Sequence, residues 1–202
     1  MAKRILLAGV LGGLAMFVWS ALAHIVLGTG SVGIKDIPKE QAMISAMRTN
    51  ITQPGFYFFP GLGVPLSAPT AELNAAIKAR EDKVLNGPSG IMVYFPSGRR
   101  ELTPGQLGTE LGTNIVQGIL AAILLSFAPG LRSYISRVGF VALAGLMAGI
   151  TTNVSYWNWY GFPGNYTAAY ALTEIIGYVC IGLVTAAIVR HSTPAVASAR
   201  TA

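Results

Sequence analysis

Charged residues are scarce in this chain. Only 11% of its 202 residues are Asp, Glu, Lys or Arg, against roughly 25% in an ordinary soluble domain, whereas 52% are hydrophobic. The 14 basic residues outnumber the 8 acidic ones, but they fall in small groups beside long apolar runs and form no patch typical of nucleic-acid binding. The composition therefore predicts a membrane protein and argues against a nucleic-acid partner.

Cysteine and histidine are also scarce. The one cysteine, Cys180, lies in an apolar run, so a disulfide or a cysteine-based zinc site within one chain is excluded, and we expect a small buried side chain there. In the topology below, His24 and His191 lie about a membrane thickness apart, which excludes bis-histidine haem ligation, and a haem on His24 alone lacks a supporting motif. The P-loop, dinucleotide-binding, HExxH and nucleophile-elbow motifs are absent. The sequence implies no metal and no cofactor.

Four apolar runs are long enough to span a bilayer, which requires about 20 residues of helix. They cover approximately residues 5–27, 112–128, 138–156 and 168–189. Each run carries a pair of small residues at the spacing with which membrane helices pack closely: Gly9 and Gly13, Gly118 and Ala122, Gly145 and Gly149, Gly182 and Ala186. The sequence therefore predicts an all-α integral membrane protein with a bundle of four transmembrane helices.

The first run has a competing interpretation as a secretory signal peptide. Basic residues precede it, and Ala21-Leu22-Ala23 resembles a cleavage site. However, the run exceeds the usual signal-peptide core of about 7 to 15 residues, and Gly9 and Gly13 have packing spacing. Both features favour a retained transmembrane helix.

The short flanks of the runs indicate the orientation, because Lys and Arg near a span tend to stay in the cytoplasm. In a four-span topology six basic residues fall on one side, without an acidic residue among them: Lys3, Arg4, Arg132, Arg137, Arg190 and Arg200. We therefore expect both termini to be cytoplasmic and the long loop 28–111 to be extracytoplasmic. The pattern fits a bacterial inner membrane.

The long loop is rich in apolar and aromatic residues, which favours a small α+β cap over a disordered linker. We expect helices over about 38–50 and 69–85, and strands over 56–59 and 91–95 that pair as an antiparallel ribbon. Thr103-Pro104 with Gln106 forms a capping-box pattern, so the second transmembrane helix should begin there. The predicted organisation is thus 1–27 for the first helix, 28–111 for the cap, 112–190 for the other three helices and 191–202 for a disordered tail.

Two short connections join the last three runs, over residues 129–137 and 157–167. The second contains Trp157, Trp159 and Tyr160, which are typical of anchors at a membrane interface. An alternative is a stacking surface for a quinone or a lipid headgroup.

Polar residues within the runs are the candidate functional residues, because an ionisable group at membrane depth usually faces protein or a water-filled cavity. Glu174 is the only acidic residue in these runs, while His24, Asn114 and Asn153 lie near the outer ends of the other three. The four side chains would then converge on a cavity open to the outside. His and Asn near an interface often satisfy only a neighbouring helix end, and a structural Glu174 bound to His24 or Tyr170 stays an alternative.

Each apolar run carries small residues at helix-packing spacing, the long loop is structured, and the sequence contains no recognisable catalytic motif. These features favour a non-enzymatic accessory or structural subunit of a membrane complex. Its partners would be the lipid bilayer and other membrane subunits or further copies of the chain. The first alternative is a small transporter or ligand-binding bundle that uses the outer cavity, with Glu174 as a proton or cation site. The second is a membrane enzyme acting on a lipid or quinone. The sequence does not identify a substrate or partner.

Overall fold

The computed structural model describes residues 1–190, so the predicted disordered tail 191–202 lies outside the described residues. The chain is mostly helical (69%) and contains one two-stranded sheet. It divides into two compact units. Within the described residues, the first unit comprises Met1–Ile34, Leu102–Trp157 and Phe162–Arg190, and the second comprises Lys35–Glu101 and Asn158–Gly161.

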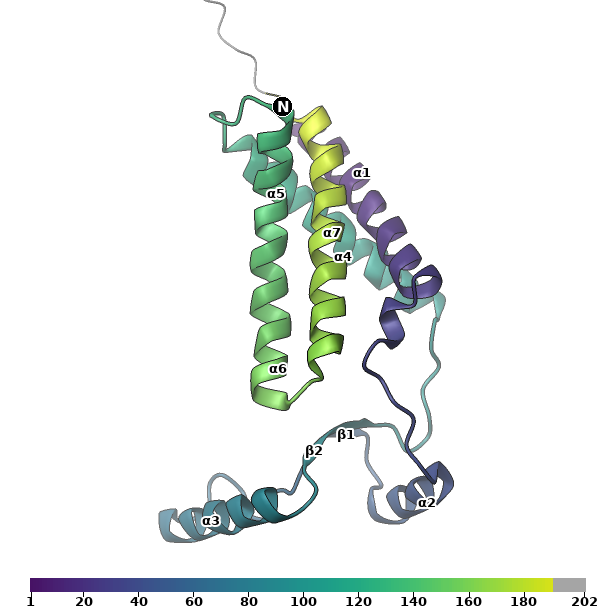
Figure 1. Cartoon of the computed structure of the whole chain (residues 1–202), viewed down its shortest axis with the longest axis vertical. Helices are drawn as coiled ribbons and strands as arrows, with labels where there is room; N and C mark the ends of the chain where they lie inside the picture. Colours follow the sequence, from purple (N-terminus) through teal and green to yellow (C-terminus); the bar gives the residue numbers. More distant parts are fainter. Residues whose placement is uncertain (191–202) are drawn as a thin grey trace, which may run out of the picture. The chain divides into compact units, whose positions relative to one another are not determined.

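Four helical stretches of the described chain are long and apolar enough to cross a membrane, as the sequence predicts (Figure 1). The first is α1 (Ala2–Ala21) with the π-helical η1 (Leu22–Val26), and the second is α4 (Pro104–Ser126). The third runs through α5 (Tyr134–Gly149), the π-helical η3 (Ile150–Val154) and α6 (Ser155–Tyr160), and the fourth is α7 (Gly164–Ile188). A short 3-10 turn, η2 (Thr29–Ser31), follows η1.

The predicted start of the second helix is confirmed. Thr103 Oγ1 accepts a hydrogen bond from the Gln106 backbone N–H at 3.2 Å, and the Thr103 N–H donates to Gln106 Oε1 at 2.9 Å. Because α4 begins at Pro104, well before the apolar run at 112, Glu110 belongs to this helix. Glu174 is the only acidic residue in the apolar runs, but the four long helices of the described chain contain Glu110 as well.

The two short connections differ from the prediction because helix extends into both of them. Arg137, expected in a turn, lies in α5 and is only 7% exposed. Its Nε donates to the carbonyl oxygen of Ala186 at 3.1 Å, and its Nη1 donates to that of Arg132 at 2.9 Å. The guanidinium thus joins the last turn of α7 to the connection before α5, where free helix carbonyls attract a cation. At the other end of the bundle, only residues 161–163 separate α6 from α7.

Within the first unit α1 packs against both α4 and α7, and α7 packs against α5, whereas α4 and α5 contact each other little. Glycines allow the close contact between α1 and α4. A Cβ atom on Gly9 would lie 2.5 Å from the Ile119 Cα, and a Cβ atom on Gly118 would meet the Gly9 carbonyl oxygen. The small-residue stripes of α1 and α4 therefore face each other at backbone contact, which is how membrane helices gain dispersion energy.

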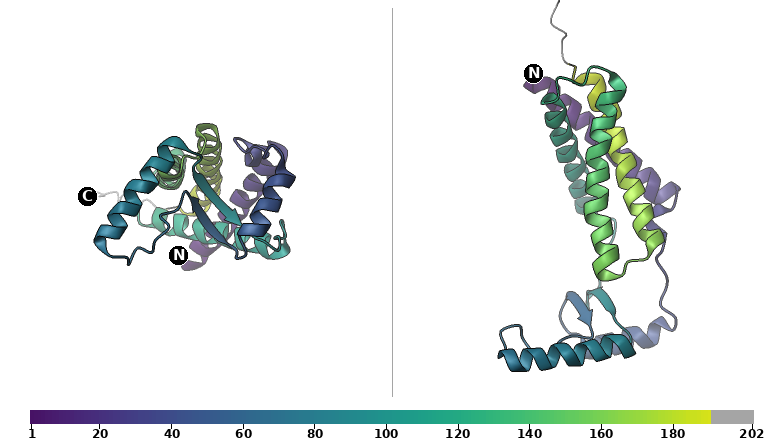
Figure 2. Two further views of the ribbon diagram at one scale, coloured as in Figure 1. Left: turned by 90° about the horizontal axis from the view of Figure 1, so that it is seen from below. Right: turned by 60° about the vertical axis from the view of Figure 1, so that its left-hand side comes forward.

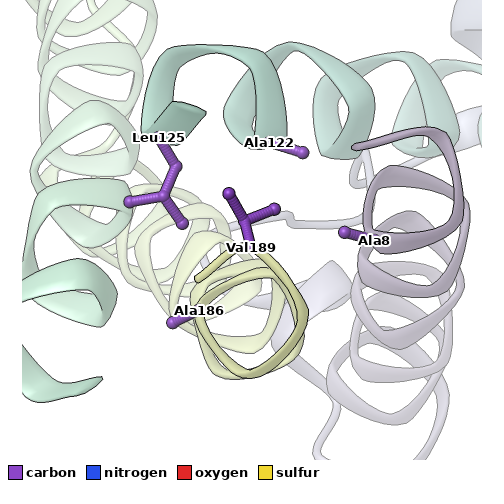
Figure 3. Packing of buried hydrophobic residues seen from close by; sticks show 5 residues of the cluster. All are labelled: Ala8, Ala122, Leu125, Ala186 and Val189. Atoms are coloured by element: carbon purple, nitrogen blue, oxygen red, sulfur yellow. The ribbon is translucent and has the colours of Figure 1, made fainter. Parts of the chain in front are cut away.

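Small side chains also dominate the core of the bundle. One buried cluster joins α1, α4 and the C-terminal end of α7 and consists of Ala8, Ala122, Leu125, Ala186 and Val189 (Figure 3). A second cluster, nearer the middle of the helices, contains Met16, Ala121, Val141 and Ile181. Both clusters lie away from the η1 and η3 turns, so the bundle is most tightly closed at the end that holds the N-terminus.

The second unit contains the predicted helices and strands: α2 (Glu40–Asn50), β1 (Gly55–Phe59), α3 (Thr70–Asn86) and β2 (Gly90–Tyr94). The strands pair antiparallel with Phe56 opposite Val93, and the two helices lie on either side of this ribbon (Figure 2). No residue of Lys35–Glu101 is buried. Phe56, Phe58 and Val93 are instead about half exposed or more, at 53%, 46% and 63%.

Candidate functional site

The first unit contains a partly open cavity of about 410 Å³, lined by residues from all four long helical stretches. Its lining includes every residue of the predicted polar cluster: His24, Asn114, Asn153 and Glu174. The scarce contact between α4 and α5 leaves this space, while α1 and α7 form the wall between them.

The α4 wall carries polar groups without partners. Asn114 is 1% exposed, and its Nδ2 has no hydrogen-bond partner within residues 1–190. One turn further along the helix, the buried Gln117 Oε1 also lacks a partner within the described chain. A buried amide without a hydrogen bond costs about 1 to 3 kcal/mol, so water or another polar molecule in the cavity would stabilise these two groups.

Two π-helical turns position the other predicted residues. His24 lies in η1, whose register change is seen in the hydrogen bond from the Leu27 N–H to the Leu22 carbonyl at 3.0 Å. Asn153 lies in η3 and is buried, and its Nδ2 donates to the Gly149 carbonyl at 3.1 Å. One extra residue in a turn rotates the following side chains, and such π turns occur frequently at functional sites. Both π turns of the described chain contribute a residue to this cavity.

Glu174 is half-buried on α7, ten residues or about 15 Å along the helix from Gly164. One carboxylate oxygen accepts a hydrogen bond from Asn153 Nδ2 at 3.3 Å. This hydrogen bond comes from Asn153 and not from His24 or Tyr170, which the sequence analysis considered as partners of Glu174. His24 instead lies beside Tyr170, with 5.5 Å between ring centroids. Asn153 therefore orients the carboxylate from η3 while leaving it at the cavity.

Aromatic rings form the remaining wall. Tyr166 and Tyr170 stack with centroids 4.4 Å apart, and Phe162 continues the row at 5.2 Å from Tyr166. Across the cavity wall, Trp19 Nε1 donates to the Thr173 carbonyl at 2.9 Å and ties α1 to α7. The lining thus combines aromatic faces with a few polar groups, the usual composition of a small-molecule site.

The ionisable side chains that line the cavity are mainly acidic. Its lining carries two carboxyl groups, Glu110 and Glu174, and one imidazole, but no Lys or Arg from the described chain. Within residues 1–190 no three His, Cys, Asp or Glu side chains are grouped so that they could hold a metal ion. The arrangement can neutralise and hydrogen-bond a cationic molecule.

Sequence reasoning missed Glu110 and Gln117, although their spacing carried a signal. Together with Asn114 they stand at i, i+4 and i+7, which places three polar groups on one face of a helix. The tyrosines of α7 were missed as cavity residues for a similar reason: Tyr166 and Tyr170 precede Glu174 at intervals of four residues. Glu110 and Tyr166 precede the apolar runs 112–128 and 168–189, so the apolar-run criterion did not include them, whereas Gln117 and Tyr170 lie within these runs.

The predicted interface aromatics do not line the cavity. Trp157, Trp159 and Tyr160 lie in α6 and are 52%, 78% and 39% exposed. In the second unit, the Tyr160 ring lies 5.9 Å from that of Phe58. Cys180 is partly exposed, so the expectation of a buried side chain there is wrong.

Comparison of the chain with protein-family models, with curated proteins and with solved structures finds no match. Function must therefore be inferred from the cavity itself.

Proposed function

We propose that the chain is an integral membrane protein that binds a small polar ligand in the cavity enclosed by its four spanning helices, as a receptor or carrier for that ligand. The observation that carries the proposal is the buried Asn114 amide, whose Nδ2 has no partner within residues 1–190 although it lines the cavity. A bundle stabilised only by its own contacts gains nothing from such a group.

A location in the membrane is supported by the side chains that point away from the bundle. Many are large and apolar and are more than half exposed, including Leu6, Val18, Val116, Leu120, Leu143, Met147 and Leu172. In water so much apolar surface would drive aggregation, whereas lipid tails solvate it without cost. The close packing of α1 against α4 supports a first helix that is retained and is part of the bundle.

The proposed orientation places both termini in the cytoplasm and the second unit outside, in a bacterial inner membrane. Five of the six basic flank residues lie in the described chain: Lys3, Arg4, Arg132, Arg137 and Arg190. They belong to the start of α1, the α4–α5 connection, the first turn of α5 and the end of α7, which gather at one end of the first unit (Figures 1 and 2). The positive-inside rule then supports a cavity that opens on the opposite side.

Cysteine accessibility tests the cavity. In a Cys180→Ala background, Gln117→Cys and Val116→Cys place a thiol at neighbouring positions of α4, one on the cavity lining and one on a surface that is 55% exposed. The reagent is a charged methanethiosulfonate, applied to the protein reconstituted in lipid. A charged reagent reaches a thiol only through water, so the two positions report on different surroundings at nearly the same depth.

We expect Gln117→Cys to be labelled at least about tenfold faster than Val116→Cys, because a lipid-facing thiol is shielded from a charged reagent. Equal and slow labelling of both variants would mean that water does not enter the cavity, and the proposal would fail. Equal and fast labelling would show that α4 does not lie against lipid, and the membrane topology would fail with it.

A second candidate, an accessory subunit of a membrane complex, is favoured by the second unit. Its strands expose Phe56, Phe58 and Val93, and it has no buried residue of its own within Lys35–Glu101. An apolar surface of this kind is typical of contact with another membrane protein subunit. Solubilisation in mild detergent followed by sizing tests this candidate: a monomer without a copurifying partner would oppose it.

A further inference from the structure

We propose that the ligand of this cavity is a small organic cation that carries a hydroxyl or carbonyl group close to its charge. This inference rests on the proposed function and names the class of ligand. Three independent features of the lining support it: the sign of its charge, the nature of its aromatic wall and the unpartnered amides of α4.

The charge of the lining favours a cation over an anion or a neutral molecule. Glu110 and Glu174 face the cavity without a Lys or Arg of residues 1–190 among the lining residues. A counter-charge stabilises a carboxylate that is removed from bulk water, and Asn153 supplies Glu174 with one hydrogen bond at 3.3 Å but with no charge. A bound cation provides the missing charge.

The aromatic wall favours an organic cation over a metal ion. Trp19, Tyr156, Tyr166 and Tyr170 all line the cavity, and an ammonium group within about 6 Å of such a ring is attracted by its π electrons. A dehydrated metal ion needs several oxygen, nitrogen or sulfur ligands converging on one point, and the described chain offers no group of three His, Cys, Asp or Glu.

The amides of α4 specify the second group of the ligand. Asn114 Nδ2 requires an acceptor and Gln117 Oε1 requires a donor, and the two side chains are one helical turn apart on the same wall. A hydroxyl group both donates and accepts, so a single hydroxyl satisfies both. A carbonyl oxygen satisfies Asn114 alone. The ligand therefore resembles an amino alcohol more than a simple alkylammonium ion.

Choline and two of its analogues test each feature separately. 3,3-Dimethylbutan-1-ol has the shape and hydroxyl of choline but no charge, and tetramethylammonium has the charge but no hydroxyl. Each is titrated at constant ionic strength into the purified full-length protein in a mild detergent, and the thermal midpoint is followed, since a ligand that binds the folded state raises it. Choline fills only part of about 410 Å³, so we expect a dissociation constant on the order of 1 mM.

We expect choline to raise the midpoint with saturation, tetramethylammonium to bind at least about threefold more weakly, and the neutral alcohol to have no saturable effect. Glu174→Gln should weaken choline binding by at least about tenfold. Glu110→Gln, a variant of an exposed residue near the start of α4, should weaken it severalfold and covers the case in which Glu174→Gln fails to fold. Glu101→Gln, outside the cavity lining, should bind as the wild type does.

Binding of the neutral alcohol as tightly as choline would overturn the inference but leave a ligand-binding cavity. Unchanged choline affinity in both Glu174→Gln and Glu110→Gln would also overturn it, because the cation would then bind elsewhere. Absence of any response overturns it too, and the labelling of Gln117→Cys separates that case from failure of the cavity: a fast reaction retains the proposed function, and a slow one removes both.

The same chemistry occurs in free amino alcohols and in lipid headgroups, and reconstitution distinguishes these sources. Nanodiscs of phosphatidylglycerol alone are compared with nanodiscs in which half of the lipid is phosphatidylcholine. Weaker binding of free choline in the mixed discs would show that the headgroup competes for the cavity, and equal binding would identify a free cation. Both outcomes support an organic-cation site, whereas absence of choline binding in both kinds of disc opposes it.

Discussion

The contact between α1 and α4 gives the most specific stability prediction, and Gly118→Ala is the substitution that tests it. A Cβ atom at this position would meet the Gly9 carbonyl oxygen and would lie 2.7 Å from the Gly13 backbone nitrogen. These are backbone atoms of a neighbouring helix, so relief requires the two helices to separate. Overpacking of this kind costs about 1 to 3 kcal/mol.

Gly112→Ala is the matched control on the same helix, because a Cβ atom there would have nothing within 4 Å. It should stabilise the protein by about 0.5 to 1 kcal/mol through helix propensity alone. Since 1 kcal/mol corresponds to roughly 2 to 4 °C for a chain of this size, the melting midpoints of the two variants should differ by about 3 to 16 °C. The assay is thermal unfolding in mild detergent. Equal midpoints would refute the backbone contact between the two helices.

Three further outcomes follow from individual contacts. Arg137→Gln should lower stability by about 1 to 3 kcal/mol, because the Nε donor to the Ala186 carbonyl and the guanidinium that joins α7 to the connection before α5 are lost; chemical denaturation in mixed micelles measures this. Trp19→Phe should cost about 0.5 to 1.5 kcal/mol in the same assay, since it removes the 2.9 Å hydrogen bond between α1 and α7. For the topology, Ser97→Cys in a Cys180→Ala background should react with an impermeant maleimide on intact cells, and Gly130→Cys should react only after permeabilisation; the reverse result would invert the proposed orientation.

Much of the fold could be predicted because its signals are local. The capping box at Thr103 and Gln106 is a pattern of four residues, and it forms as expected. The paired strands were indicated by aromatic and β-branched residues, and their register places Phe58 opposite Ile91. The glycines of α1 and α4 could be recognised by spacing, but not their partners: which two stripes meet depends on tertiary packing.

The cavity could be predicted only in part. His24 and Asn153, which lie within the π-helical η1 and η3, were predicted from their polarity near the ends of apolar runs, whereas Gln117 of α4 and Tyr166 of α7 were not. Which side chains of neighbouring helices line one cavity depends on tertiary packing. Glu110 was assigned to the loop because hydropathy falls at 112 although the helix does not end there. Arg137 was taken as an indicator of topology, while in the fold it is also a buried donor to helix carbonyls.

The central claim is that the cavity is kept polar for a ligand and not for the stability of the bundle, and a pair of substitutions tests it directly. Asn114→Leu removes a buried amide whose Nδ2 has no partner within residues 1–190, whereas Asn153→Leu removes an amide that donates to the Gly149 carbonyl and to Glu174. The thermal midpoint of each variant is measured without ligand. We expect Asn114→Leu to be as stable as the wild type or more stable, by up to about 1 to 3 kcal/mol, and Asn153→Leu to be less stable by a similar amount. A loss of stability in Asn114→Leu as large as that in Asn153→Leu would show that both amides are structural and would contradict the claim.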